Sequence, residues 1–371
     1  MTSLLLLDKK INRSLPIIVE RQYNNSRSIL IENPNLSNNM QNSLRKIPYY
    51  VCKINQIGIN PVIGLVSLIN YEDFPSKIIP HEQVYKDKVN DYVQQFIVSS
   101  VLNNPILLFY RKFSDLQLFL SQIIHNLNPI IAQCVDGITY EVFPVDSCEI
   151  LVKLEYYLAQ ITKFYIADGH HRIHALSKIK RQSATTFSQN YLSFIVQEDE
   201  LRLGSFNRLI KGIDINTEFF IRQLRQKYLI EKAPQDALNC VDNIYIYIND
   251  IWYQLELKKQ IYSSKFTQFP SVHIDKFIIS LLASHYPLTS KILYSPGTGR
   301  IDDILQFYAK NQCQVAINIP KLSLHDLFRV TKQYCKFPPH STYFTPKIPN
   351  DLFIQKINFS PDHTEDLLYD Y

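Results

Sequence analysis

The stretch FYIADGHHRIHAL, residues 164–176, places three histidines, an arginine and an aspartate directly behind an apolar run. The apolar run predicts the end of a buried strand, and the Asp168-Gly169 pair predicts a tight turn. Apolar residues then recur at helical spacing. We therefore predict a strand over residues 162–167 and a helix over residues 170–180.

A strand, a tight turn and a helix N-terminus together favour an anion site. The helix N-terminus offers backbone N–H groups without helical partners and about half a positive charge from the macrodipole. Gly169 lets the backbone approach a ligand, and His170, His171 and Arg172 add donors beside it. Asp168 has three candidate roles: capping the helix, orienting a histidine, or holding a magnesium ion beside phosphates. We expect Arg172, at an exposed helix start, to contribute little to core packing.

Two other interpretations of this segment stay open. In the first, Asp168 is only an N-cap and the histidines lie on the surface, which does not explain a His-His-Arg run. In the second, His170 and His174 bind a metal ion, since residues four apart share one helix face. The zincin motif requires a glutamate where His171 stands, and Arg172 would repel a dication. The pattern therefore favours phosphate binding over both.

Composition is typical of a globular protein of the cytoplasm. The 371 residues suffice for two subdomains, and 46% hydrophobic and 20% charged residues fit a folded chain. Six scattered cysteines without a CxxC pair argue against a zinc module or a disulfide framework and suit a reducing compartment. The net charge of +5 is small, and no basic run or helix-turn-helix indicates a nucleic-acid partner.

No segment of the sequence predicts membrane contact. The start, MTSLLLLDKK, holds four leucines, fewer than the about 7–15 apolar residues of a signal-peptide core. No run approaches the roughly 20 apolar residues of a membrane span. We therefore expect a cytoplasmic protein without a membrane partner, and a homo-oligomer stays an open alternative to a monomer.

Predicted strands and helices alternate along the chain, which indicates an α/β protein with two lobes. Strands are expected over residues 47–56 and 62–73, and a helix over residues 274–284. Strict alternation on both sides of the Asn249-Asp250 pair predicts a two-residue hairpin.

Two segments carry weaker signals. Residues 1–45 are rich in asparagine and serine, so we expect loop or partly disordered chain there. The segment SPGTGR, residues 295–300, lacks the Gly-Lys-Ser/Thr of a Walker loop. It is predicted as a turn with weak phosphate-binding potential at Arg300. The break between the two lobes is expected near residue 185.

The segment YIADGHHRIHAL resembles the signature of the domain of unknown function 1015 family, and the resemblance extends over roughly residues 45–355. The Asp-Gly-His-His-Arg block and the Ser-Thr-Tyr-Phe-x-Pro-Lys block are specific in combination. The matching blocks outside the signature are GLVSLINYEDFPSKIIPHE (64–82), NPILLFYR (104–111), DGITYEVFPV (136–145), YLSFIVQEDELRLGSFNRLI (191–210) and FPPHSTYFTPKIPNDLF (337–353).

That family is similar to the ParB/sulfiredoxin-like superfamily, in which the same strand–turn–helix element binds nucleotide phosphates. The relatives with the closest motif are free-serine kinases, which move a phosphoryl group from a nucleotide to the hydroxyl of L-serine. The resemblance implies an α/β (α+β) fold: a divergent N-terminal segment (1–45), a ParB/sulfiredoxin-like nucleotide-binding lobe (46–185) and a second α/β lobe (186–371). It implies ATP or ADP with Mg2+ as cofactors and a small hydroxylated metabolite as substrate.

The resemblance also implies roles for single residues. Glu82 is the candidate base for the acceptor hydroxyl, and Asp168 holds magnesium or orients a histidine. His171 joins these two in the implied catalytic set. The implied cofactor-binding residues are Gly169, His170, His171, Arg172, His81, Arg208, Ser341 and Lys347.

Several positions depart from the family pattern. Tyr85 and Tyr92 stand where arginines are expected, Asn207 replaces a histidine, and His340 replaces a lysine. The N-terminal Pro-Pro-Tyr-Asp-Val block is not recognisable. These departures leave a second hypothesis open, in which the chain is a ParB-like nucleotide-binding or regulatory module without turnover.

Overall fold

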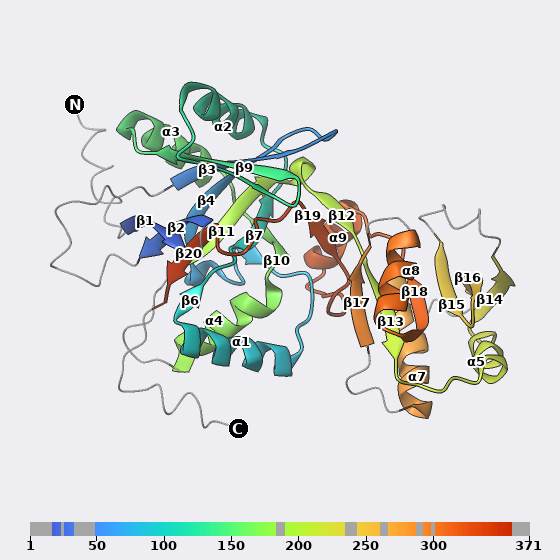
Figure 1. Ribbon diagram of the computed structural model, residues 1–371. Coiled ribbons are helices and arrows are strands. Elements are labelled where there is room, and N and C mark those ends of the chain that lie inside the picture. The colour runs from blue at the N-terminus through green and yellow to red at the C-terminus, as the bar shows by residue number, and fades with distance from the viewer. Residues whose placement is uncertain are drawn as a thin grey trace. The chain divides into compact units, whose positions relative to one another are not determined.

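The computed structural model describes residues 17–23, 26–32, 49–182, 190–233, 243–259, 266–286, 292–297 and 301–357. The chain forms two compact units (Figure 1). The first unit comprises Met1–Ile79, Val84–Leu201 and Pro346–Tyr371, and the second comprises Pro80–Gln83 and Arg202–Thr345. The first unit extends beyond the predicted break near residue 185, because the strand Asn190–Gln197 pairs within the sheet of this unit.

The first unit is built around an eight-stranded mixed sheet with the order β5-β10-β7-β11-β4-β3-β9-β8. Most neighbours are antiparallel, but β10 pairs with β5, and β11 with β7, in parallel. Strand β7 is buried along its whole length, as expected for an inner strand of a sheet with both faces covered. The strands are β3 (Tyr49–Gln56), β4 (Val62–Asn70), β5 (Ile78–Ile79), β7 (Ile106–Tyr110), β8 (Ile131–Val135), β9 (Ile138–Val145), β10 (Phe164–Asp168) and β11 (Asn190–Gln197).

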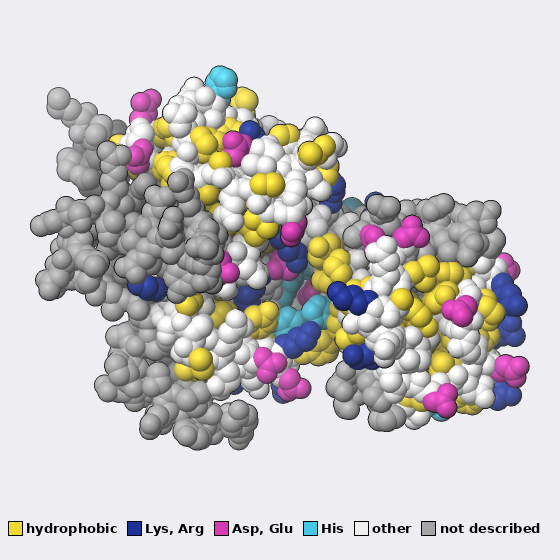
Figure 2. Space-filling view, in the orientation of Figure 1, with side chains coloured by type: hydrophobic (Ala, Val, Ile, Leu, Met, Phe, Trp, Pro, Cys, Tyr) yellow, Lys and Arg dark blue, Asp and Glu magenta, His cyan; other side chains and the backbone are white. Residues whose placement is uncertain are grey.

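Two pairs of helices lie on opposite sides of this sheet in Figure 1. Helix α1 (Lys86–Ser99) packs against α4 (His170–Gln182), and α2 (Ser114–Asn126) packs against α3 (Cys148–Ala159). Hydrophobic side chains are exposed over α2 and α3 in Figure 2, where Leu118, Val152 and Tyr156 are more than half exposed.

A smaller four-stranded sheet completes the first unit, in the order β1-β2-β20-β6. Its strands are β1 (Ile17–Tyr23), β2 (Ser26–Glu32), β6 (Val101–Leu102) and β20 (Phe353–Lys356). Strands β1 and β2 pair as an antiparallel hairpin. The N-terminal segment therefore contains regular structure where loop was predicted.

The second unit is built around a six-stranded antiparallel sheet with the order β14-β16-β15-β18-β13-β17. One face is covered by a core that includes Ile246, Ile274 and Ile278, all fully buried. The strands of this unit are β12 (Arg202–Gly204), β13 (Phe206–Lys211), β14 (Tyr228–Lys232), β15 (Ile244–Ile248), β16 (Ile251–Leu257), β17 (Ile292–Pro296), β18 (Cys313–Asn318) and β19 (Tyr343–Thr345). The helices are α5 (Thr217–Leu224), α6 (Pro270–His273), α7 (Ser280–His285), α8 (Ile301–Lys310) and α9 (Leu324–Lys332).

The structure confirms the mixed α/β class and the predicted strand–turn–helix element, because β10 ends at Asp168 and α4 begins at His170. It also confirms the hairpin, whose Asn249 and Asp250 have φ values of +47° and +61°. The predicted helix over residues 274–284 is not regular, since Ile274–Ile279 are π-helical between α6 and α7. The assignment of the N-terminal lobe to the ParB/sulfiredoxin-like superfamily stays a prediction.

Two other expectations concern membranes and the segment at residue 300. Within the part of the chain that the structure describes, no helix has the length and apolar character needed to cross a bilayer. Arg300, with its weak phosphate-binding potential, lies outside the described residues.

Candidate functional site

The predicted anion site is centred on Gly169, in the turn between β10 and α4. The first hydrogen bond of α4 runs from the Ile173 amide to the Gly169 carbonyl over 2.9 Å. Gly169 has a φ of +104°, which L side chains rarely adopt. A Cβ atom there would lie 2.8 Å from Ile106 Cδ1 and 3.2 Å from Arg172 Nη2. The turn therefore requires glycine for its backbone conformation and for the space beside it.

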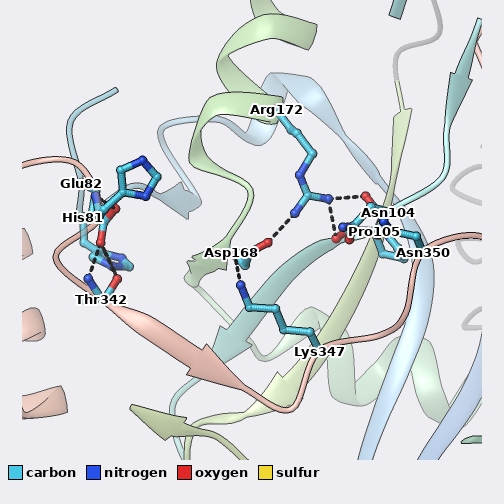
Figure 3. Close-up of polar contacts among 10 residues, drawn as sticks. His81, Glu82, Asn104, Pro105, Asp168, Arg172, Thr342, Lys347 and Asn350 are labelled. Atoms are coloured by element: carbon cyan, nitrogen blue, oxygen red, sulfur yellow. Dashed lines mark hydrogen bonds and ion pairs between the residues drawn. The ribbon is translucent and has the colours of Figure 1, made fainter. Parts of the chain in front are cut away.

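Asp168, the last residue of β10, binds two cations within the first unit (Figure 3). Its Oδ1 accepts a hydrogen bond from Lys347 Nζ at 2.5 Å, and its Oδ2 accepts one from Arg172 Nη2 at 2.5 Å. Burial raises the pKa of Asp168, but Arg172 and Lys347 outweigh burial and hold the pKa below its usual value. The carboxyl group is therefore ionised, and the three side chains together carry one net positive charge.

Arg172 is a buried structural residue as well as a partner of Asp168. It is only 6% exposed, and its Nη1 donates to the carbonyl oxygens of Asn104 and Pro105. Those carbonyls immediately precede β7, so the guanidinium ties the start of that strand to helix α4. The expectation that Arg172 is exposed and contributes little to folding is therefore wrong.

Lys347 differs from Arg172 in its access to solvent. Its side chain is 33% exposed, whereas that of Arg172 is 7% exposed. The Lys347 carbonyl accepts a hydrogen bond from the Tyr140 hydroxyl at 3.3 Å, which holds the backbone in place. A lysine ammonium on a flexible stem can move from one anionic partner to another. Lys347 is thus the cation of this group that can turn toward a ligand.

Asp168 does not fit the expected role of a magnesium ligand in this arrangement. Both of its oxygens accept hydrogen bonds from Lys347 and Arg172, and these two cations would repel a magnesium ion bound directly to the carboxylate. Among the residues with a described placement, no group of three or more His, Cys, Asp and Glu side chains is placed to hold a metal ion.

His171 is a neutral imidazole. The Tyr85 backbone amide donates to His171 Nε2 at 3.2 Å, so Nδ1 carries the ring proton. Burial, together with the smaller effects of the Lys88 and His174 charges, lowers the pKa of His171 to about 4. At neutral pH this side chain is therefore uncharged and adds no positive charge to the site.

His170 and His174 make a contact within helix α4. His174 Nδ1 donates to the His170 backbone carbonyl at 2.7 Å, and the His174 ring packs edge-on against Phe74 with 5.1 Å between centroids. The His170 side chain is buried. This hydrogen bond fixes the His174 ring and leaves its Nε2 outside the contact, so the metal-site alternative at the two residues stays a prediction.

Helices α1 and α4 present their N-termini at the same place. His171 at the start of α4 contacts Tyr85, which precedes α1, and further along Lys178 Nζ donates to Asn90 Oδ1 at 3.0 Å. The residue numbers rise together along both helices, from the Tyr85–His171 contact to the Asn90–Lys178 contact, so the two helices run parallel. Their macrodipoles therefore place two positive ends together beside His171, which favours a bound anion there. The sequence alone gave no signal for this pairing.

The second unit holds a buried cluster of His81, Glu82 and Thr342 (Figure 3). Glu82 Oε1 accepts hydrogen bonds from the Thr342 amide at 2.7 Å and from the Thr342 hydroxyl at 2.5 Å. Glu82 Oε2 accepts one from the His340 amide at 3.1 Å, and His81 Nε2 lies 2.8 Å from Thr342 Oγ1. His81 is completely buried, and Glu82 and Thr342 are each 5% exposed.

The environment of Glu82 changes the pKa of its carboxyl group. Burial raises the pKa of Glu82 to about 7, although the bonds from Thr342 and His340 and the charge of Arg208 act in the opposite direction. A group with such a pKa gains and loses a proton readily at neutral pH, as a general base must. Glu82 belongs to the second unit and Asp168 to the first, and a shared cleft between Glu82 and His171 stays a prediction.

Arg208 is committed to the interior of the second unit. It is 1% exposed, and hydrogen bonds account for all five N–H donors of its guanidinium. The acceptors are the carboxylate of Asp275 and the carbonyls of Phe206, Pro339 and His340. Arg208 thus positions the loop that supplies donors to Glu82. In this arrangement it has no N–H left for a nucleotide, in contrast to its predicted role.

Ser341 is also buried in the second unit, where its hydroxyl donates to the Pro338 carbonyl at 2.8 Å. The fold therefore sorts the predicted residues into two groups. The first unit holds Asp168, Gly169, His170, His171, Arg172 and Lys347, and the second holds His81, Glu82, Arg208 and Ser341. Sequence reasoning did not assign Asp275 or the Thr342 link to Glu82.

Comparisons with solved structures find matches of low identity and low TM-score. A free serine kinase in complex with AMP is 14% identical, with a TM-score of 0.41, and the match covers 77% of this chain and 92% of that chain. SbnI with a C-terminal truncation, from Staphylococcus aureus, is 12% identical, with a TM-score of 0.42 and coverage of 77% and 85%. A conserved hypothetical protein from Pyrococcus furiosus is 14% identical, with a TM-score of 0.44 and coverage of 81% and 97%.

Sequence comparison identifies the family directly. No curated protein matches the chain. The profile of a family described as "Protein of unknown function (DUF1015)" matches residues 40–278. Since this region spans more than half of the 371 residues, the chain belongs to the DUF1015 family.

Proposed function

We propose that this chain binds the phosphates of ATP or ADP at the N-terminus of helix α4 and transfers a phosphoryl group to a small hydroxylated metabolite. The choice of reaction rests on the resemblance of the Asp-Gly-His-His-Arg motif to free-serine kinases, so serine is the first acceptor to test. The choice of site rests on the charges around Asp168. In this proposal the first unit is the nucleotide-binding unit.

The observation that carries the proposal is the pairing of Asp168 with the partly exposed Lys347 beside Gly169. Two cationic side chains share the Asp168 carboxylate there, beside the N-termini of two parallel helices. An incoming phosphate replaces Asp168 as the partner of Lys347, while Arg172 continues to neutralise Asp168. Phosphate oxygens are strong acceptors for charged donors and for helix N-termini, so they match this site better than a neutral ligand.

Glu82 is the proposed base for the acceptor hydroxyl, because burial raises its pKa to about 7. In phosphoryl transfer the protein mainly positions groups and neutralises charge, and the base receives the proton of the attacking hydroxyl. A nucleotide brings its own magnesium ion on its phosphate oxygens. The alternative is a regulatory module that binds nucleotide without turnover, which the tyrosines in place of arginines at Tyr85 and Tyr92 favour.

The phosphate site is tested by Lys347→Gln, with nucleotide affinity measured by isothermal titration calorimetry. We expect at least a tenfold loss, since a hydrogen bond to a charged group contributes about 1.5–3 kcal/mol. The matched control is Lys53→Gln. Lys53 pairs with Glu141 at 3.0 Å and is 28% exposed, but it lies on β3, four strands from β10 in the sheet order. Equal affinities for the two variants would contradict the proposed site.

Turnover is tested separately by incubating the chain with ATP or ADP, magnesium and a panel of hydroxylated amino acids and hydroxy acids. Mass spectrometry of the small molecules should detect a phosphorylated acceptor, with serine as the leading candidate. Glu82→Gln should abolish the product and leave nucleotide affinity within about twofold, because the proposed base acts on the acceptor. Nucleotide binding without any phosphorylated product would favour the regulatory module.

A further inference from the structure

We infer that Asp275 is a positioning residue for the proposed base, because it holds Arg208 against the loop whose backbone binds Glu82 Oε2. This inference rests on the proposed function for its use in turnover, but its geometry is independent of any ligand. Asp275, Arg208, Glu82 and the loop of residues 338–342 all belong to the second unit. Asp275 acts on Glu82 through Arg208.

The two carboxylate oxygens of Glu82 differ in how many hydrogen bonds they accept. Oε1 accepts two, from the Thr342 amide at 2.7 Å and from the Thr342 hydroxyl at 2.5 Å (Figure 3). Oε2 accepts one, from the His340 amide at 3.1 Å. Each carboxylate oxygen has about two acceptor positions. Within the part of the chain that the structure describes, Oε2 therefore keeps one acceptor position for a ligand, on a side chain that is 5% exposed.

Oε2 is consequently the oxygen that takes the proton in the proposed reaction. The O–H bond of the acceptor metabolite breaks, and an O–H bond forms on Glu82 Oε2. The electron pair that stays on the acceptor oxygen forms the new bond to phosphorus. The bond from phosphorus to the bridging oxygen of the nucleotide breaks, and its electron pair leaves with the nucleotide.

The peptide group between Pro339 and His340 connects Oε2 to Arg208. Its N–H donates to Glu82 Oε2, and its C=O accepts from Arg208 Nη2 at 3.4 Å. The N–H and C=O of a trans peptide point in opposite directions, so Arg208 and Glu82 lie on opposite sides of this group. Arg208 Nη1 also donates to the His340 carbonyl at 2.7 Å. These contacts hold His340 at a φ of +57°, which L residues other than glycine adopt infrequently.

Asp275 fixes the guanidinium of Arg208 in the orientation that the loop requires. Its Oδ1 accepts from Arg208 Nε and its Oδ2 from Arg208 Nη2, both at 3.2 Å. Two parallel bonds of this kind determine the plane of the guanidinium. Asp275 lies on the π-helical segment Ile274–Ile279, which the fully buried Ile274 and Ile278 anchor in the core. Such π-helical turns are frequent at functional sites.

The charges around Glu82 give Asp275 a measurable effect on it. The charged and titratable groups that face Glu82 are Arg208, His340 and His81, whose Nε2 lies 3.8 Å from Oε1. Burial raises the pKa of Glu82 to about 7, and the charge of Arg208 acts in the opposite direction. Asp275 neutralises Arg208. Loss of the Asp275 charge therefore strengthens the effect of Arg208 and lowers the pKa of Glu82.

The test follows the titration of Glu82 by NMR in the full-length chain labelled with 13C-glutamate, in the absence of nucleotide and acceptor. The signal that is missing from Glu82→Gln identifies the residue. Asp275→Asn should move the pH midpoint of Glu82 downward by at least about 0.5 unit, since a charge nearby shifts a carboxyl pKa by about 1–3 units. Asp275→Glu keeps the charge and should return the midpoint toward that of the wild type. Asp275→Ser serves the same purpose as Asp275→Asn if asparagine does not fold.

The matched control is Asp326→Asn in the same unit. Asp326 pairs with Arg329 at 3.1 Å and is 28% exposed, against 23% for Asp275, but it lies on α9. This variant should leave the Glu82 midpoint within about 0.2 unit of the wild type, because its ion pair is not connected to the loop that binds Glu82. An unchanged or raised midpoint in Asp275→Asn would overturn the inference. Equal shifts in Asp275→Asn and Asp326→Asn would overturn it as well.

Turnover provides a second readout that loss of stability alone would not produce. In the phosphoryl-transfer assay, Asp275→Asn should move the acid limb of the pH profile of kcat downward by the same amount as the Glu82 midpoint. It should also lower kcat above that limb, because a carboxylate of lower pKa is a weaker base. A wild type that forms no phosphorylated product would contradict the proposed reaction, whereas the ligand-free titration decides the role of Asp275 by itself.

Discussion

Alanine at Gly169 should destabilise the chain more than alanine at Gly137, although both glycines have positive φ values, +104° and +76°. A Cβ atom at Gly137 meets nothing within 4 Å, so the substitution carries only the backbone cost of about 1–2 kcal/mol. At Gly169 the Cβ atom would lie 2.8 Å from Ile106 Cδ1 and 3.2 Å from Arg172 Nη2. Such overpacking adds about 1–3 kcal/mol. The expected total loss at Gly169 is therefore about 2–5 kcal/mol.

The assay is thermal unfolding followed by circular dichroism, with and without ATP or ADP. At about 2–4 °C per kcal/mol for a domain of this size, Gly169→Ala should melt roughly 4–20 °C below the wild type and Gly137→Ala roughly 2–8 °C below it. Nucleotide at a hundredfold excess over Kd should stabilise the wild type and Gly137→Ala by about 2.7 kcal/mol. Gly169→Ala should lack that stabilisation. Equal melting temperatures for the two variants would refute the close approach at Gly169, and a preserved nucleotide effect in Gly169→Ala would refute phosphate binding at this turn.

Three further substitutions test the charges of the two units. Arg172→Gln should lower the free energy of unfolding in urea by about 3–5 kcal/mol, because it leaves a carboxylate and two carbonyls without their buried donor; a loss below about 1 kcal/mol would contradict the burial of Arg172. The raised pKa of Glu82 stabilises the fold below its unfolded value of 4.5, and this contribution is lost as the pH rises through about 7. Glu82→Gln should flatten that part of the curve of unfolding free energy against pH, and an unchanged slope would show an ordinary pKa. Arg208→Lys should cost about 2–4 kcal/mol, because lysine cannot form the bidentate pair and the carbonyl bonds. The control is Arg329→Lys. Arg329 is 40% exposed and forms a 3.1 Å ion pair with Asp326, so this substitution should cost less than about 1 kcal/mol.

The sequence by itself determined the elements whose signals are local. The apolar run before Asp168, the glycine after it and the helical spacing beyond it specify a strand, a turn and a helix within about twenty residues, and the structure has all three. The hairpin at Asn249 and Asp250 was equally predictable, because two residues that tolerate positive φ fix the turn. Each of these features depends on neighbours in the chain.

Only the tertiary structure decided the chemistry of the site residues. Lys347 reaches Asp168 across 179 positions, and Thr342 reaches Glu82 across 260, and no periodic pattern encodes such contacts. Burial then changed what the residues do: Arg172 became a donor to interior carbonyls, and Glu82 acquired a pKa of about 7. A residue's charge and hydrogen-bonding capacity can be read from its type, but its solvation and its partners are properties of the packed chain.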